Sequence, residues 1–313
     1  MKKVSSKLSI IVPCYNEEEA IPLFYPEVEK AKEKMPEVEF EYWFVNDGST
    51  DNTLLELKKL NKKDPQHVHF VSFSRNFGKE AGLFCGLQRA TGNYIVVMDV
   101  DLQDPPDFLP KMHQLLAEGN YDCIGTKRAD RAGEPPIRSF FARLFYKLIN
   151  RISDTTIVDG ARDYRMMTRQ MVNAILSVKE YNRFSKGIFS WVGFKTKYLE
   201  YSNKERSAGT TSWNFWNLLQ YSIDGIVAFS DVPLNIAAFT GLFSFIGAGL
   251  AIIWIITRAV IFGDPTSGWP SLVCIILFVS GIQLFCLGIV GKYIGKIFLE
   301  VKHRPLYIVK EEK

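Results

Sequence analysis

Short apolar runs alternate with amphipathic stretches up to about residue 126 of the 313-residue chain. The runs are rich in β-branched and aromatic residues, and they predict strands at residues 8–13, 40–45, 68–73, 94–98 and 121–126. The stretches between them predict helices near residues 17–34, 51–62, 79–90 and 107–118. Strands separated by helices indicate an α/β fold whose mainly parallel sheet is covered on both faces.

Polar clusters follow three of the predicted strands, at residues 13–18, 46–51 and 99–105. The carboxyl ends of parallel strands share one edge of the sheet, and ligands bind there. Asp99 and Asp101 lie two residues apart after a buried strand, and such hard oxygen ligands suit Mg²⁺ or Mn²⁺ shared with substrate phosphates. A polar turn is the alternative at this cluster, and Asn16 and Asp51 could each be a helix N-cap.

Glycine-rich phosphate loops are absent from the sequence. It contains neither a Gly-x-Gly-x-x-Gly motif nor a Walker-type loop, which disfavours a dinucleotide site or a P-loop. Recognition of a nucleotide by side chains, with a metal on its diphosphate, fits the three polar clusters better.

A basic amphipathic helix is predicted at residues 137–152. Its cations fall away from the apolar stripe, and the span holds no acidic residue, which favours a position at the membrane interface. The alternative is an ordinary helix that packs on the core, because such a helix shows the same stripe. The apolar positions are Ile137, Phe140, Phe141, Leu144, Phe145, Leu148, Ile149 and Ile152.

The C-terminal third is strongly apolar. Residues 232–257 and 265–291 carry no charged side chain, and each run exceeds the roughly 20 residues that an apolar helix needs to cross a bilayer. We therefore expect transmembrane helices at 232–262 and 267–291, preceded by a juxtamembrane helix at 211–231. A basic tail at 292–313 would place both termini in the cytoplasm, with a cytoplasmic catalytic domain at 1–210.

Composition narrows the possibilities further. Hydrophobic residues make up 47% of the chain, and the net charge of +4 gives little reason to expect a nucleic-acid partner. The five cysteines form no Cys-x-x-Cys pair, which disfavours a disulfide framework or a zinc site and favours a reducing compartment. The apolar run after the basic N-terminus breaks at Pro13, so no signal peptide is expected.

These pieces together suit an enzyme that brings a soluble substrate to a lipid. A nucleotide would bind the α/β domain, and a metal in the acidic cluster would neutralise a leaving diphosphate. Arginines near the membrane would hold an anionic lipid head group. We therefore expect a transferase that moves a group from a nucleotide carrier to a polyprenyl phosphate.

Several motifs also resemble those of a known family. Residues 13–18, 46–51, 74–79 and 99–105 are similar to motifs of the family 2 glycosyltransferases. Further features resemble the bactoprenol glucosyltransferase branch, a polyprenyl-phosphate glycosyltransferase group. They are Arg128, the runs 163–165, 206–209 and 301–305, and the two apolar spans. Dolichyl-phosphate mannose synthase is a more distant relative. The resemblance implies the GT-A fold, a Rossmann-like, mainly parallel sheet, with interfacial helices and two transmembrane helices.

The resemblance also implies roles for individual residues. The nucleotide and donor would contact Pro13, Tyr15, Asn16, Glu17, Asp47, Lys79, Asp99 and Gln103. The metal would bind Asp99, Asp101 and Gln103, and the acceptor phosphate would contact Arg128, Arg131 and Arg138. The implied catalytic residues are Asp101, Asp163 and Arg206. Many relatives have a lysine after the Gly-x-Thr/Ser of the Arg206 loop, where this chain reads Thr211-Ser212-Trp213.

Asp163 occupies the position at which a catalytic base is proposed in relatives. A phosphate monoester has its second pKa near 6, so the acceptor is already largely dianionic at neutral pH. A base would then contribute less than it does with a hydroxyl acceptor. We therefore expect Asp163 to position groups in the site.

The expected reaction is an inverting, metal-dependent transfer of one sugar from a UDP-sugar to undecaprenyl phosphate on the cytoplasmic leaflet. Glucose is the first candidate, and N-acetylglucosamine and galactose stay open. The product would donate its sugar for modification of a cell-surface polymer, with membrane lipid, a second copy of the chain and a flippase as possible partners. The alternatives are a polymerising family 2 synthase and a non-enzymatic membrane subunit that recruits a flippase or polymerase.

Overall fold

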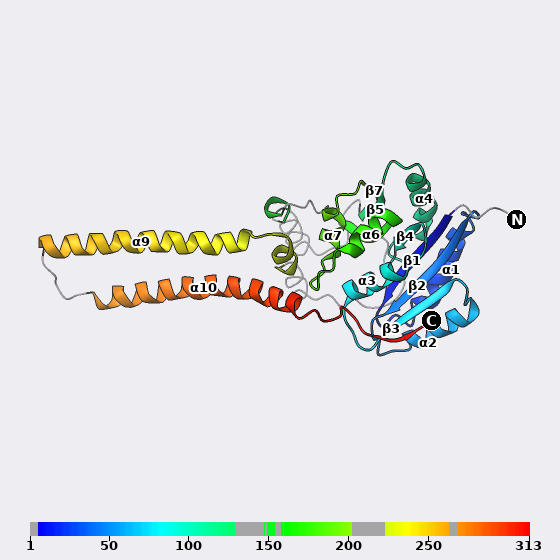
Figure 1. Cartoon of the computed structure of the whole chain (residues 1–313), viewed down its shortest axis with the longest axis horizontal. Coiled ribbons are helices and arrows are strands. Elements are labelled where there is room, and N and C mark those ends of the chain that lie inside the picture. The colour runs from blue at the N-terminus through cyan, green and yellow to red at the C-terminus, as the bar shows by residue number, and fades with distance from the viewer. Residues whose placement is uncertain are drawn as a thin grey trace.

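The computed structural model describes residues 6–128, 147, 149–153, 158, 160–201, 223–262 and 268–313. Figure 1 shows a layered α/β body from which two long helices extend side by side. The first strand, β1 (Ser6–Cys14), and the last, β8 (Val309–Glu312), both belong to the α/β body.

Eight strands of the described chain form one sheet in the order β7-β5-β6-β4-β1-β2-β3-β8. The neighbours β1–β2, β1–β4, β2–β3 and β5–β7 are parallel, whereas β6 runs antiparallel to β4 and β5, and β8 antiparallel to β3. The predicted mainly parallel α/β sheet is therefore confirmed. The strands are β1 Ser6–Cys14, β2 Val38–Asn46, β3 Val68–Phe73, β4 Tyr94–Val97, β5 Cys123–Arg128, β6 Ala161–Thr168, β7 Thr196–Tyr201 and β8 Val309–Glu312.

Helices cover both faces of this sheet. Side chains of β1 alternate between the faces, so that Leu8 and Ile10 pack with α1, α2 and α4, while Ile11 packs with α3, α6 and α7. Both sets of side chains are buried, as expected for a sheet sandwiched between helical layers. The helices are α1 Ile21–Lys32, α2 Thr53–Lys63, α3 Lys79–Arg89, α4 Leu109–Ala117 after the 3₁₀ turn Pro106–Phe108, α6 Arg169–Ser177 and α7 Ser185–Trp191.

Strand β6 was not anticipated from the sequence, and it matters for the site. Its register places Arg165 opposite Val97 at the end of β4. Because β6 runs against β4, its first residues lie at the same edge of the sheet as the carboxyl end of β4. Strand β7, strand β8 and helix α7 were also not anticipated.

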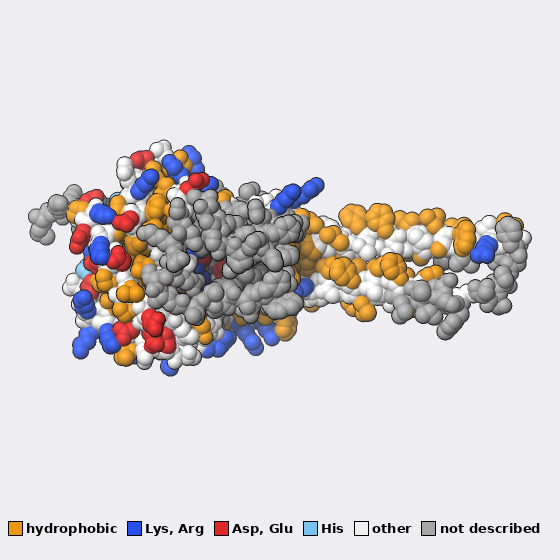
Figure 2. Space-filling model, turned by 180° about the vertical axis from the view of Figure 1, so that it is seen from behind, with side chains coloured by type: hydrophobic (Ala, Val, Ile, Leu, Met, Phe, Trp, Pro, Cys, Tyr) orange, Lys and Arg blue, Asp and Glu red, His pale blue; other side chains and the backbone are white. Residues whose placement is uncertain are grey.

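Two long helices, α9 (Val232–Phe262) and α10 (Trp269–Val301), extend from the α/β body. Each contains a segment that is long and apolar enough to cross a membrane, judged by length and composition: Val232–Ala251 and Phe278–Val301. Figure 2 shows apolar side chains on the outside of this helical pair. An apolar surface of this size is unusual on a water-exposed helix and typical of one that faces lipid or another protein.

The chain returns to the sheet after α10. Residues 292–313, expected as a basic tail, instead complete α10 to Val301 and then form the edge strand β8. Arg89 binds the Glu312 carboxylate through Nε at 2.6 Å and Nη2 at 2.8 Å, and the ring of Tyr307 stacks on Phe73. The end of the second long helix is thus fastened to the same sheet that carries β1.

The expected interfacial helices are described only in part. Residues 147 and 149–152 are helical, and Ile149 is fully buried beside Phe184. Residues 223–229 are also helical, within the expected juxtamembrane helix. The other residues of 137–152 and all of 211–222 lie outside the described residues.

Candidate active site

Four loops meet at one edge of the sheet, which we call the rim. They follow the neighbouring strands β4, β1, β2 and β3, at residues 98–104, 15–18, 47–51 and 74–78. The chain leaves β1 toward β2 on one side, and β4 returns to the other side of β1, so the strand order reverses there. Such a switch point is where open α/β sheets bind ligands.

The loops after β1 and β2 are joined by hydrogen bonds. Asn16 has a left-handed backbone (φ 56°), and its side-chain oxygen accepts from the Thr50 amide at 2.9 Å. The Asn16 amide in turn donates to Ser49 Oγ at 2.9 Å. Asn16 therefore connects two loops and does not cap α1, whose N-cap residue is Ala20. Asp51 accepts from the Thr53 amide at 3.0 Å, but the N-cap residue of α2 is Asn52, so Asp51 lies one residue before the cap.

The loop after β3 is packed tightly on the loop after β2. Gly48 has a φ of +64°, and a Cβ there would lie 2.2 Å from the backbone carbon of Arg75. A glycine is therefore required at this position, because any other residue would be strained at this φ and its Cβ would clash with the backbone of Arg75. Asp47 accepts from the amides of Phe77 at 2.6 Å and Gly78 at 2.9 Å, so its carboxylate orders the residues that lead into α3.

Residues expected to contact a nucleobase also lie on the rim. Tyr15 is 42% exposed, and Pro13 near the end of β1 and Glu17 on the loop are half-buried. The Glu17 amide donates to Thr53 Oγ1 at 2.8 Å, which fixes the loop against α2. The exposed ring of Tyr15 is available for stacking with a base.

The acidic turn after β4 is held in an unusual backbone conformation. Leu102 has a φ of 56°, in the left-handed region that residues other than glycine rarely adopt. The Gln103 amide donates to Asp101 Oδ1 at 3.2 Å across this turn, and Asp101 is only 7% exposed. Strained turns of this kind persist where the surrounding structure holds them, often at functional sites.

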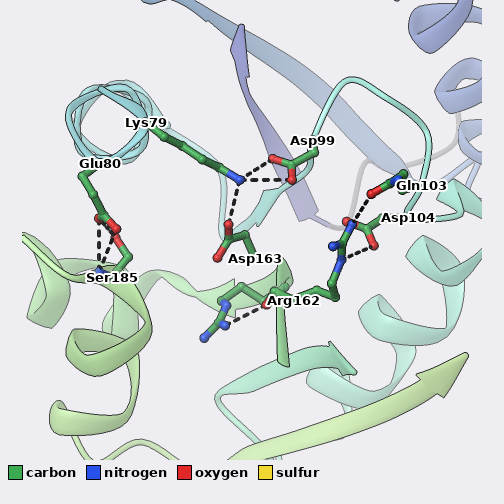
Figure 3. Close-up of polar contacts among 9 residues, drawn as sticks. Lys79, Glu80, Asp99, Gln103, Asp104, Arg162, Asp163 and Ser185 are labelled. Carbon is green, nitrogen blue, oxygen red and sulfur yellow. Dashed lines mark hydrogen bonds and ion pairs between the residues drawn. The ribbon is translucent and has the colours of Figure 1, made fainter. Parts of the chain in front are cut away.

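Lys79 lies between two carboxylates at the centre of the rim (Figure 3). Its Nζ is 2.8 Å from Asp99 Oδ1 and 2.7 Å from Asp163 Oδ2. Burial raises the pKa of the Asp163 carboxyl. The positive charges of Lys79 and, to a smaller extent, Lys186 lower it more, so the pKa lies well below its usual range. Asp163 is therefore ionised and paired at neutral pH, and it is a weak proton acceptor.

A second ion cluster lies on the other side of the acidic turn. Arg162 donates through Nε to Asp104 Oδ1 at 3.2 Å and through Nη2 to Gln103 Oε1 at 3.0 Å (Figure 3). The Tyr201 hydroxyl also donates to Asp104, whose side chain has no exposed surface. Burial raises the pKa of Asp104, and Arg162 opposes this shift. Sequence reasoning singled out Gln103 but missed Asp104, Arg162 and Tyr201, although Asp104 belongs to the acidic motif and Arg162 precedes Asp163.

Glu80 is a half-buried carboxylate that the sequence did not single out. It accepts hydrogen bonds from the Ser185 amide at 3.1 Å and from the Ser185 hydroxyl. Burial raises the pKa of Glu80. The pair joins the first turn of α3, which carries Lys79, to the N-terminus of α7 (Figure 3).

The chemistry of the donor set fits a divalent metal that is shared with a substrate. Within the described part of the chain, no group of three or more His, Cys, Asp and Glu side chains could hold a metal on its own. Asp99 and Asp101 could supply two hard oxygen ligands, since Mg²⁺ typically takes one or two carboxylates and completes its shell with phosphate oxygens and water. The amide oxygen of Gln103 already accepts from Arg162, so Gln103 is the weakest of the three expected ligands.

The expected acceptor residues can be placed only in part. Arg128 is the last residue of β5, and its backbone lies opposite Tyr201 of β7. Arg131, Arg138 and Arg206 lie outside the described residues.

Comparisons with known proteins give consistent results. Residues 9–176 match the glycosyl transferase family 2. The chain is 43% identical to the bactoprenol glucosyl transferase of Shigella phage SfV over 307 residues, which cover 98% of this chain and 99% of that protein. It is 44% identical over 310 residues to the prophage bactoprenol glucosyl transferase homolog of Escherichia coli (strain K12), with 98% and 99% coverage. A mannosyltransferase of Pyrobaculum calidifontis, solved with GDP-Man and Mn²⁺, aligns with a TM-score of 0.49 at 15% identity over 94% of this chain and 89% of that one.

Proposed function

This chain belongs to glycosyl transferase family 2, and from this premise we propose that it transfers one sugar from a UDP-sugar to a polyprenyl phosphate. Undecaprenyl phosphate is the proposed acceptor, and glucose is the first candidate for the sugar. One observation carries the proposal: the similarity to bactoprenol glucosyl transferases extends over 98% of the chain and so includes the two apolar helices as well as the rim.

We propose that α9 and α10 cross the membrane and that both termini are cytoplasmic. Strand β8, which follows α10, pairs with β3 in the same sheet as β1, so the α/β body and the C-terminus lie on one side of any membrane that the two helices span. Lys292 and Lys296 lie in the C-terminal part of α10, and Lys302 and Arg304 follow its end, so the excess of cations favours the cytoplasm for that side.

A labelling experiment tests this topology. In a variant whose five native cysteines are replaced, a membrane-impermeant maleimide applied to intact spheroplasts should label Gly268→Cys, between the helices, and leave Lys310→Cys unlabelled. Labelling of Lys310→Cys in intact spheroplasts would contradict the proposed orientation.

The rim supplies what a nucleotide-sugar donor needs. Tyr15 would stack on the base, and Asp99 and Asp101 would hold a divalent ion at the diphosphate. A bound Mg²⁺ or Mn²⁺ would neutralise the charge that develops on the departing UDP. Asp47 and Gly48 would keep the loops that surround the donor in one fixed arrangement, since both already bind or pack on the loop after β3.

The acceptor phosphate would attack the anomeric carbon from the side opposite UDP. A bond forms between a phosphate oxygen and that carbon while the bond from the carbon to the UDP oxygen breaks, which gives a β-linked lipid phosphosugar. The acceptor is largely dianionic at neutral pH, so orientation matters more than proton removal. The ion pair of Asp163 with Lys79 supports a positioning role for Asp163.

The lipid-linked sugar would then serve as a donor for modification of a cell-surface polymer. Assembly with a second copy of the chain and cooperation with a flippase are further parts of the proposal. The flippase follows from the need to move a lipid-linked sugar from the leaflet where it forms to the leaflet where it is used, and assembly with a second copy is carried over from the resemblance.

A transfer assay tests the proposed function directly. The purified chain in detergent would be incubated with undecaprenyl phosphate and, in separate reactions, radiolabelled UDP-glucose, UDP-N-acetylglucosamine, UDP-galactose and a GDP-sugar. We expect radiolabel in an organic-soluble lipid with at least one UDP-sugar. Absence of a labelled lipid with every donor would sink the proposal.

A further inference from the structure

The position of Lys79 carries two electrostatic costs. It is the first residue of α3, and the N-terminus of a helix bears a partial positive charge that disfavours a cation. Burial also lowers the pKa of Lys79, but Asp163 and Asp99 raise it more, so the net pKa is above the ordinary value. The two carboxylates therefore keep a charged ammonium where the helix alone would disfavour it.

Lys79 engages both oxygens of an expected metal ligand. Its Nζ is 2.8 Å from Oδ1 and 3.0 Å from Oδ2 of Asp99 (Figure 3). A divalent ion that binds Asp99 must take at least one of these oxygens from the ammonium. The exchange is feasible because both side chains reach the surface: 38% of the Lys79 side chain and 27% of the Asp99 side chain are exposed.

The ammonium retains a partner during such an exchange. Asp163 Oδ2 lies 2.7 Å from Nζ, on a strand that is not part of the acidic turn. An ammonium has three N–H donors, so Lys79 can release Asp99 and stay paired with Asp163. Asp47 holds the residues just before Lys79 in place through the Phe77 and Gly78 amides, so the exchange needs movement of the lysine side chain only.

We propose that Lys79 is an internal counter-ion that occupies Asp99 in the donor-free enzyme and yields it to the divalent metal when the nucleotide diphosphate binds. This inference rests on the proposed metal at Asp99 and Asp101, and it adds a control on when that metal binds. Lys79 acts through Asp99 and is a positioning residue. The consequence is that metal alone binds weakly and that metal and nucleotide strengthen each other's binding, an effect that is reciprocal.

Direct measurement of Mn²⁺ binding tests this inference without reference to transfer. Free Mn²⁺ would be followed by electron paramagnetic resonance as it is titrated with the full-length protein in detergent, with and without UDP. An opposite charge within a few ångströms changes the affinity of a carboxylate for a proton by roughly 10- to 1,000-fold. By analogy, Lys79→Met should bind Mn²⁺ alone about tenfold more tightly than the native chain, and UDP should then increase its Mn²⁺ affinity by a correspondingly smaller factor.

Two further variants separate this role from a general loss of positive charge. Lys186 also lowers the pKa of Asp163, so Lys186→Met removes a nearby cation but keeps the contacts between Lys79 and Asp99. We expect its Mn²⁺ affinity to stay within about threefold of the native value, and the same for Lys79→Arg, which keeps the charge. If Lys79→Met does not fold, the comparison of Asp163→Asn with Asp163→Asn/Lys79→Met should show the same tenfold rise.

The outcomes are distinct. Unchanged Mn²⁺ binding in Lys79→Met, or an equal rise in Lys186→Met, would overturn the role of Lys79 and leave the proposed transfer reaction standing. Failure of the native chain to bind Mn²⁺ even with UDP would overturn both this inference and the proposed metal site. Loss of sugar transfer with normal Mn²⁺ binding would count against the proposed function alone.

Discussion

Two cation–carboxylate clusters flank the same acidic turn, and they differ in how firmly they are held. Lys79 pairs with Asp99 and Asp163, whose side chains keep 27% and 19% of their surface exposed. Arg162 pairs with Asp104, whose side chain has no exposed surface. Both carboxylates of the first cluster therefore reach the surface, whereas the second cluster holds a fully buried carboxylate beside an arginine that is 20% exposed.

The kind of cation follows the same division. A lysine ammonium is a compact charge on a flexible stem, so it can exchange partners with little rearrangement. An arginine guanidinium presents donors in a fixed plane, and Arg162 uses two of them on Gln103 and Asp104 at once. We propose that the Arg162 cluster fixes the turn and that the Lys79 cluster serves the ligand. The following experiments test whether the two clusters differ in this way.

The largest effect is expected at Asp101. Replacing it with Asn keeps the size of the side chain but removes a charge that would hold the metal at the diphosphate. Transfer should fall by about 10²–10³-fold, the usual loss when one preorganised electrostatic contact in a transition state is removed. Initial rates at saturating donor and acceptor would measure it.

Asp107→Asn is the matched control for this variant. Asp107 lies on the same segment, but its side chain is 71% exposed and pairs with Lys34. Transfer by Asp107→Asn should stay near the native rate. An Asp101→Asn enzyme that transferred sugar at a third of the native rate or more would refute the assignment of the metal site.

The second effect concerns stability and should be found at Arg162. Replacing Arg162 with Met leaves the buried Asp104 without its cation, and breaking a buried ion pair in this way typically costs about 3–5 kcal/mol. Thermal or denaturant unfolding of the purified chain would measure the loss. Lys79→Met should cost clearly less, because its partners are partly solvated.

Adding Asp104→Asn to Arg162→Met should recover part of the lost stability, since the uncompensated charge is then removed. A larger loss of stability in Lys79→Met than in Arg162→Met would reverse the comparison between the two clusters.

The third effect is a moderate one at Asp163. The folded-state pKa of Asp163 lies below its unfolded value, so the side chain is ionised throughout pH 5–8. The stability it contributes is therefore present above the unfolded pKa of about 3.9 and is lost only as the pH falls through the depressed folded value. Asp163→Asn should lower turnover by about tenfold through lost positioning.

The pH profile distinguishes positioning from base catalysis. Any fall in rate on the acid side should follow the second pKa of the acceptor phosphate, near 6, and it should be the same in Asp163→Asn as in the native enzyme. Complete loss of turnover at every pH, with donor and acceptor binding intact, would instead favour a base.

The smallest effect is expected at Ser185. Ser185→Ala removes one of the donors to Glu80 while the Ser185 amide remains, so the free energy of unfolding should fall by about 1 kcal/mol. Ser177→Ala is the control, because that exposed hydroxyl donates only to the Ala174 carbonyl on its own helix. Equal melting temperatures of the two variants would show that the Glu80 contact adds nothing to stability.

The N-terminal part of the fold follows the sequence closely. The strands predicted at 8–13, 40–45 and 68–73 correspond to β1, β2 and β3, since each is an apolar run with few charges. Their polar ends then form the rim, because parallel strands must bring their carboxyl ends together.

The second half of the site could not be read from the sequence in the same way. The second, third and fifth residues of strand β6 are Arg162, Asp163 and Arg165, so its charges hide the pattern of a strand. Its antiparallel position beside β4 is a long-range pairing that no local pattern specifies. The pairing of Asp163 with Lys79, and of Arg162 with Asp104, depends on that register.

The most direct test of the account is the mass of the lipid that forms when the purified chain meets UDP-glucose and undecaprenyl phosphate. The account predicts a product that carries one hexose on the lipid phosphate and that forms at a far lower rate with Asp101→Asn. A product that carries a chain of several sugars, or no glycosylated lipid with any sugar nucleotide, would contradict it.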